Sequence, residues 1–135
     1  MHVRIYHNVA RDHDGHMIHF LGYEQGHPLV PVFDADIDLS HPDWANLPEA
    51  IFEACNVDVD QIDGPMRSLA RAYRERRLRS LSVGDVVVIG DGDDRIALKV
   101  AQMGFSPVPT AELNVVNETD HGTEPWPVGA PRVRI

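Results

Sequence analysis

Apolar and polar residues alternate at the start of the chain, and this alternation predicts the first β-strand. In residues 2–7, Val3 and Ile5 fall on one side and the residues between them on the other, which is the period-two pattern of a half-buried strand. The polar stretch 8–16 predicts a loop. The apolar segment 17–23 that follows would return as a second strand, so the N-terminal region is predicted to form a hairpin.

Three further segments have the character of strands. Residues 29–33 are apolar on both faces, but Pro31 has no backbone N–H to donate, so we place this strand at an edge of the sheet. The β-branched run 83–89 leads through a Gly/Asp turn cluster into renewed alternation over 96–103, which predicts a hairpin. A short strand is also expected at 113–116.

Helical spacing predicts two helices in the middle of the chain. The first runs from about residue 47 to 55, because Asn46 and Pro48 are typical of a helix start and the apolar positions recur at i, i+3, i+4 and i+7. The second runs from about residue 63 to 78. Its predicted core stripe consists of Met66, Leu69, Ala70 and Tyr73. The predicted fold class is α+β, a mostly antiparallel sheet of four to six strands with two helices.

At 135 residues the chain has the length of one domain. We expect residues 1–108 to form the α+β domain and residues 109–135 to form an extended, proline-rich tail, which Trp126 could anchor on the core. The sequence contains neither an apolar run long enough to span a membrane nor the pattern of a signal peptide. The single Cys55 is predicted to be a buried core thiol, which suits the reducing cytoplasm.

Charge is distributed unevenly. The formal net charge is −9 at pH 7, which argues against a general polyanion binder. Basic residues nevertheless gather in and after the second helix. Guanidinium groups bind phosphates and carboxylates, so this cluster is our predicted binding surface for a partner protein or a nucleic acid. The alternative is a solvated face that pairs with acids of the same chain. The cluster consists of Arg67, Arg71, Arg74, Arg76, Arg77 and Arg79.

Catalytic and metal motifs give little support for an enzyme. His13, His16 and His19 recur every third residue after His7, but neither an HExxH motif nor a nearby cysteine completes a ligand set, so we expect no metal and no cofactor. A GxSxG elbow and a glycine-rich phosphate loop are both missing. We therefore assign no catalytic residue. An enzyme whose site joins the N-terminal histidines to the acids of residues 34–38 stays an alternative.

Residues 79–88, RSLSVGDVVV, resemble the RSLSVGDVV signature of small YodL-like proteins from actinomycete plasmids, integrative elements and phages. Other blocks agree with that family in the same order, so the likeness covers about residues 3–105, whereas the tail departs from it. These blocks are Tyr6-His7-Asn8, Gly22-Tyr23, Gly26-His27-Pro28-Leu29-Val30, Asn56-Val57 and Ala72-Tyr73-Arg74. The resemblance assigns no role to the signature residues Ser80, Ser82, Gly84 and Asp85.

The resemblance implies an accessory of mobile DNA. Together with the arginine cluster it leads us to expect a non-catalytic binding or regulatory protein that contacts a protein or nucleic acid of the mobile element or its host. We expect no membrane among its partners. A third alternative is an acidic DNA mimic of the antirestriction type. A mimic needs aligned negative charge at the density of duplex DNA, and the arginine cluster interrupts such an alignment.

Overall fold

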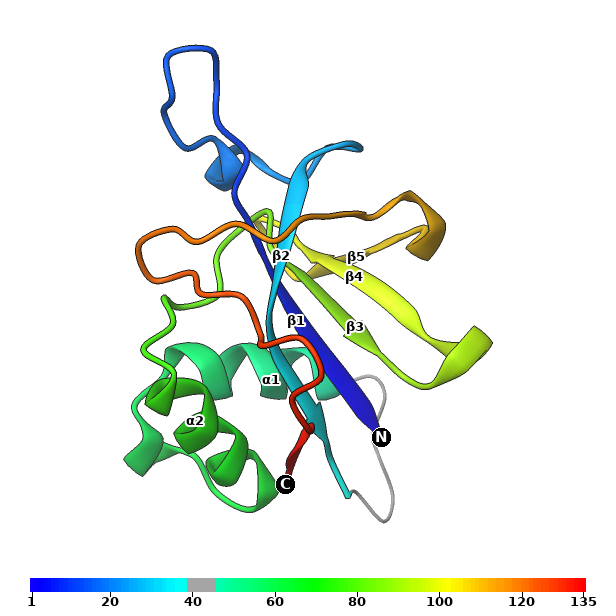
Figure 1. Cartoon of the computed structure of the whole chain (residues 1–135). Helices are drawn as coiled ribbons and strands as arrows, with labels where there is room; N and C mark the ends of the chain where they lie inside the picture. The colour runs from blue at the N-terminus through cyan, green and yellow to red at the C-terminus, as the bar shows by residue number, and fades with distance from the viewer. Residues whose placement is uncertain (39–45) are drawn as a thin grey trace.

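The computed structural model describes residues 1–38 and 46–135, which form one curled sheet with two helices beside it (Figure 1). The strands are β1 (His2–Asn8), β2 (Pro28–Asp36), β3 (Val86–Ile89), β4 (Ile96–Val100), β5 (Phe105–Val108), β6 (Asn114–Val115) and β7 (Val133–Arg134). The helices α1 (Leu47–Asn56) and α2 (Pro65–Glu75) separate β2 from β3. The strand order is β5-β4-β3-β1-β2-β6, with β7 also paired to β2. The α+β prediction is confirmed.

The first strand, β1, lies at the centre of the sheet between β2 and β3, and it is antiparallel to both. Val3 and Ile5 are fully buried in the core that the helices cover. Tyr6 is also buried, in a second apolar cluster that includes Leu29 and Val86. The strand is therefore more buried than the half-buried strand predicted from its alternation, because the sheet curls around this second cluster.

The predicted edge position of the strand around Pro31 is wrong, because strands pair with β2 on both sides. β2 pairs with β1 on one side and with the two-residue parallel strands β6 and β7 on the other. The register between β1 and β2 shifts where Ile5 pairs with Phe33 and Tyr6 pairs with Pro31, so Pro31 lies beside a bulge, where proline is tolerated. Its carbonyl accepts a hydrogen bond from the backbone N–H of Trp126 at 2.7 Å.

The predicted hairpin in the N-terminal region is also corrected. Residues 17–23 contain a single 3-10 turn, His19–Leu21, and only an isolated bridge joins Arg11 to Met17. Both sides of β1 are already occupied by β2 and β3, so a further strand has no edge of β1 on which to pair. The side chains of Phe20 and Leu21 are consequently exposed, at 55% and 71%.

Both helices form where helical spacing predicts them. Ile51 and Ala54 of α1 and Leu69, Ala70 and Tyr73 of α2 are buried in the core, with Met66 packed against it. Cys55 is buried as well, as predicted, and burial raises the pKa of its thiol, which keeps it protonated and unreactive. α2 ends at residue 75, three residues before the predicted end, because Arg77 adopts a left-handed backbone with φ 58°.

The hairpin predicted around residues 90–95 is present as β3 and β4, and the expected strand at 113–116 is present as β6. The tail 109–135 runs back along β2, to which it adds β6 and β7. The Trp126 ring packs edge-on against Phe33, with the ring centroids 5.9 Å apart. The tail is thus part of the same packed unit as the rest of the described chain.

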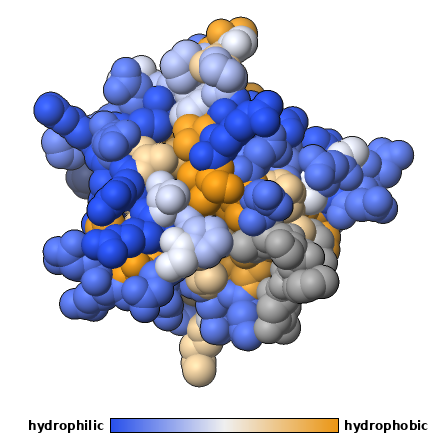
Figure 2. Space-filling view, turned by 90° about the horizontal axis from the view of Figure 1, so that it is seen from below, coloured by the Kyte–Doolittle hydropathy of each residue, from blue (hydrophilic) through white to orange (hydrophobic). Residues whose placement is uncertain are grey.

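The surface seen from below is mostly hydrophilic, and the apolar residues that show on it gather toward its middle (Figure 2). Within the described part of the chain, no helix is long and apolar enough to cross a membrane.

Trp126→Ala tests whether the tail stabilises the domain. Removing the indole uncovers Phe33 and leaves a gap beside Arg76, so we expect the free energy of unfolding to fall by about 3 kcal/mol. Urea unfolding followed by circular dichroism measures the change. Val128→Ala, two residues away at a side chain that is 98% exposed, should leave the stability unchanged. Equal stabilities for the two variants would mean that the tail contributes nothing to folding.

Candidate functional site

The six arginines of the predicted binding surface do not share one environment, and two of them are structural. Arg79 makes a two-pronged ion pair with Asp85, with N–O distances of 2.7 and 2.8 Å. Arg76 stacks on the Trp126 ring at 4.8 Å and donates to the carbonyl of Val32 at 2.9 Å. Both side chains therefore hold parts of the domain together and are not presented to a partner.

Two more arginines contact the segment between the helices. Arg74 donates a hydrogen bond to the backbone carbonyl of Val57. Arg67 pairs with the exposed Asp60 at 3.3 Å. Arg74 is half-buried and held at this carbonyl. An exposed ion pair contributes only about 0–1 kcal/mol, so Arg67 can exchange its partner readily.

Arg71 and Arg77 differ from the other four. Both are exposed, and neither side chain has a hydrogen bond or ion pair with any residue in the described part of the chain. Arg71 lies one helical turn after Arg67 on α2, so the two side chains share a face of the helix. The predicted surface is therefore reduced to Arg67, Arg71 and Arg77.

Asp85 is the centre of the hydrogen bonds in the signature segment, residues 79–88. This carboxylate is fully buried at the start of β3. It accepts hydrogen bonds from the backbone N–H groups of Asn8 and Ser82, each at 2.8 Å, in addition to the two from Arg79. Burial alone would lower the pKa of Arg79, but its hydrogen bonds to Asp85 and the charge of that carboxylate outweigh burial and raise it.

The other signature residues also act through the backbone. Gly84 has φ +93°, and a Cβ at this position would lie 2.1 Å from the carbonyl oxygen of His19, so only glycine fits. Leu81 is bound at its N–H and carbonyl by the side chain of Asn56. Ser80 accepts from Arg79 through its carbonyl. The segment that resembles the family signature therefore has a structural role, because its hydrogen bonds hold other parts of the fold in place.

Asp85→Asn tests the structural role of the ion pair between Arg79 and Asp85. The change removes the negative charge that faces a largely buried guanidinium, and a broken buried pair costs about 3–5 kcal/mol. We expect a loss of that size in the free energy of unfolding, measured by urea denaturation. Asp91→Asn, at an exposed turn between β3 and β4, is the matched control and should change little. A loss below about 1 kcal/mol for the Asp85 variant would contradict the structural role.

His7 lies near the Arg79–Asp85 ion pair, in a second buried network of hydrogen bonds. Its Nε2 is 2.8 Å from the hydroxyl of Tyr73, and its Nδ1 is 2.7 Å from the hydroxyl of Thr123. The Tyr73 hydroxyl donates its one proton to the carbonyl of Arg79, so it must accept from His7. The neutral ring therefore carries its proton on Nε2 and accepts from Thr123 at Nδ1. Burial lowers the pKa of His7 to about 3.

This low pKa predicts a specific loss of stability in acid. Below pH 6.5 the unfolded chain binds a proton at residue 7, whereas the folded chain does not until about pH 3, so acidification favours unfolding. The contribution of His7 is at most about 1.4 kcal/mol per pH unit between these values.

The measurement is urea unfolding between pH 4.5 and 7.5 for the native chain and for His7→Gln. The variant should lose stability more slowly as the pH falls. His13→Gln, at an exposed loop position, should follow the native slope. Identical slopes for all three chains would show that His7 can be protonated in the folded state.

The histidines of the possible metal site are dispersed. His7 is buried under α2, and His19 approaches the carbonyl of Val83 at 3.3 Å. Ligand atoms of Asp12, Asp14 and His16 lie within 4.8 Å of one another on an exposed loop. Exposed groups of this kind are common on loops, and no further described residue adds a buried ligand to them.

Of the described N-terminal histidines, only His2 contacts the acids of the alternative enzyme site. Asp34 contacts His2, Arg4 and Arg132, whereas His7 contacts Tyr73 and Thr123. Asp36 pairs with Arg132 as well. Asp34 and Asp36 thus form ion pairs at the end of β2 where the terminal strand β7 pairs.

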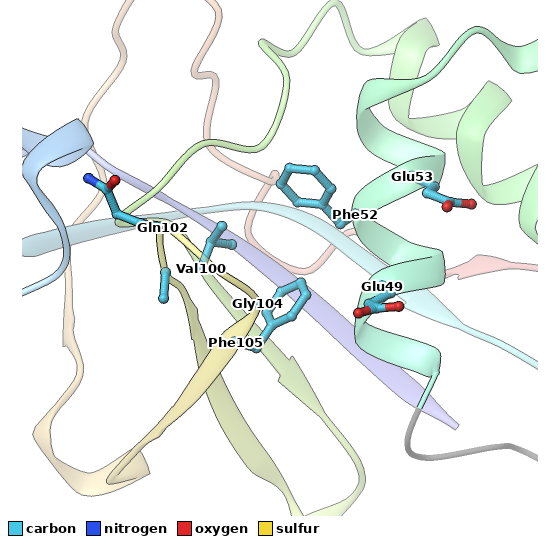
Figure 3. Close-up of a pocket in the computed structure, with 8 residues that line it drawn as sticks. Glu49, Phe52, Glu53, Val100, Gln102, Gly104 and Phe105 are labelled. Carbon is cyan, nitrogen blue, oxygen red and sulfur yellow. The ribbon is translucent and has the colours of Figure 1, made fainter.

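Sequence reasoning missed the apolar hollow between α1 and the β4–β5 hairpin (Figure 3). The Phe52 ring points from α1 toward the sheet, with Val100 and Phe105 opposite, and the two aromatic ring centroids are 6.3 Å apart. Glu49 and Glu53 border the hollow on the helix side. The available signal was Phe52, a large apolar residue outside the i, i+3, i+4 and i+7 positions that predict its helix.

Comparisons of the chain with family models, with curated proteins and with solved structures gave no match.

Proposed function

We propose that this chain is a non-catalytic binding protein that presents Arg67, Arg71 and Arg77 to carboxylates of an acidic partner protein. The observation that carries the proposal is that Arg71 and Arg77 are exposed and unpaired among the described residues of a chain with 21 acids. As the resemblance of residues 79–88 implies, we place this binding protein among the accessories of a mobile genetic element.

The backbone at Arg77 supports a role beyond folding. Its φ of 58° is the left-handed conformation that glycine usually supplies after a helix, and its N–H caps the carbonyl of Arg74 at 2.9 Å. A residue with a Cβ loses about 1–2 kcal/mol there. An arginine kept at such a position without a partner in the described chain fits a contact made outside it.

An acidic protein fits these arginines better than a nucleic acid does. Three guanidinium groups would neutralise at most about three phosphates, too few for the extended positive stripe that binding along a nucleic acid needs. Carboxylates on a protein surface need no such extended positive stripe, and guanidinium groups bind them through two parallel hydrogen bonds.

Arg77→Gly separates stability from binding. Relief of about 1–2 kcal/mol of backbone strain outweighs the entropic cost of about 0.5–1 kcal/mol that glycine adds on folding, so the variant should be more stable by up to about 1.5 kcal/mol. The same variant should bind its partner less tightly. Urea unfolding measures the first effect, and affinity capture from nuclease-treated extract of the native host, quantified by mass spectrometry, measures the second.

The full binding test compares Arg71→Gln/Arg77→Gln with Arg95→Gln/Arg134→Gln, which removes the same charge at exposed positions elsewhere. A charge-assisted hydrogen bond contributes about 1.5–3 kcal/mol, so the first variant should retain at least tenfold less of the acidic proteins that the native chain captures. Equal retention by both variants contradicts the proposal. Captured material that disappears with nuclease treatment would indicate nucleic acid instead.

A further inference from the structure

The helix layer leaves part of the sheet uncovered. On the side of the sheet that packs against α1, the apolar face continues onto β4 and β5, where Leu98 and Phe105 are half-buried and Ile96 is 45% exposed. An apolar sheet face is normally buried against another layer. In the described chain neither helix covers this corner, although α1 runs along its border (Figure 1).

Two adjoining hollows of about 390 Å³ each occupy this corner, and Glu49, Gly104 and Phe105 line both of them. One extends along α1 to Phe52, and the other extends over the sheet to Leu98. Together they form a groove, called here the α1–β5 groove, with an apolar floor.

The α1 side of the groove carries an unbalanced negative charge. Glu49 and Glu53 are exposed and lie four residues apart on α1, a spacing that makes them neighbours on the helix surface. In Figure 3 the Glu49 side chain is the nearer of the two to Phe105. Neither glutamate forms an ion pair with a described residue. Like charges at this spacing repel each other by about 0.2–0.5 kcal/mol, and a cation seated between them would remove this repulsion.

We propose that the α1–β5 groove binds an amphipathic helix of a partner protein, with its apolar face on Phe105 and Leu98 and with lysine or arginine side chains beside Glu49 and Glu53. A helix in this place would continue the layer begun by α1 and bury the exposed corner of the sheet. The basic side chains follow from charge complementarity with the two glutamates.

Two other occupants fit the surface less well. A strand added to the sheet would have to pair with β5, and Pro107 in that strand lacks an N–H and so weakens pairing. A second copy of this chain would bring its own net charge of −9 toward an acidic rim. Its unpaired arginine side chains, Arg71 and Arg77, lie on or after α2, so seating them here would create a head-to-tail contact and not a two-fold symmetric dimer.

The test uses a displayed library of amphipathic helical peptides selected on the full chain. Apolar positions vary among Leu, Ile, Phe and Met, and the flanking positions vary among Lys, Arg, Gln and Glu. Selection should enrich Lys or Arg at flanking positions about one turn apart. Enriched peptides should bind Glu49→Gln/Glu53→Gln at least tenfold more weakly in fluorescence anisotropy.

Asp93→Asn/Asp94→Asn, which removes two exposed acids at the turn between β3 and β4, is the matched control and should bind like the native chain. Enrichment of Glu, failure of the library to enrich any sequence, or equal loss for the two variants would overturn the proposal. A concentration-dependent dimer in sedimentation that Phe105→Ser dissociates would overturn it as well, because the occupant would then be a second copy. The arginines of α2 take no part, so this proposal and the preceding one can fail separately.

Discussion

The buried ion pair between Arg79 and Asp85 is the interaction on which the rest of the structure depends. Its carboxylate binds the backbone at the end of β1 through Asn8 and closes the turn into β3. The backbone of Arg79 accepts a hydrogen bond from Tyr73 of α2 and donates one to Gly122 of the tail at 2.8 Å. Helix, central strand, hairpin and tail therefore meet at one residue pair. A buried charge left without its partner costs several kcal/mol, so these four parts are expected to unfold together.

Much of the fold was predictable because it depends on local periodicity. Both helices and the β3–β4 hairpin follow from spacing that a single segment contains. The errors came from partners that are distant in the sequence. Residues 17–23 have strand-like composition, but β1 has no free edge for them. Pro31 excludes one hydrogen bond, yet it cannot reveal that two short strands from the tail flank it on either side.

The candidate sites were less predictable, for the same reason. The sequence shows six arginines close together, but only contacts from other parts of the chain distinguish them, such as Asp85 for Arg79 and Trp126 for Arg76. The α1–β5 groove joins Phe52 to Phe105, which lie far apart in sequence, and no local pattern links them. The resemblance at residues 79–88 located the structural centre of the fold, and it carried no information on a binding surface.

Residues that depart from the usual conformational and charge preferences lie at the surface and not around Asp85. The interior places a glycine where a Cβ would clash, at Gly84, and gives the buried carboxylate four hydrogen bonds. The surface, in contrast, has an arginine in the left-handed region at position 77 and two repelling glutamates on α1 beside an exposed apolar corner. Each of these features is unfavourable for the isolated chain, and contacts with a partner of opposite charge would offset that cost. Departures from local preference are expected where function constrains the sequence, and the two proposed binding surfaces rest on these residues.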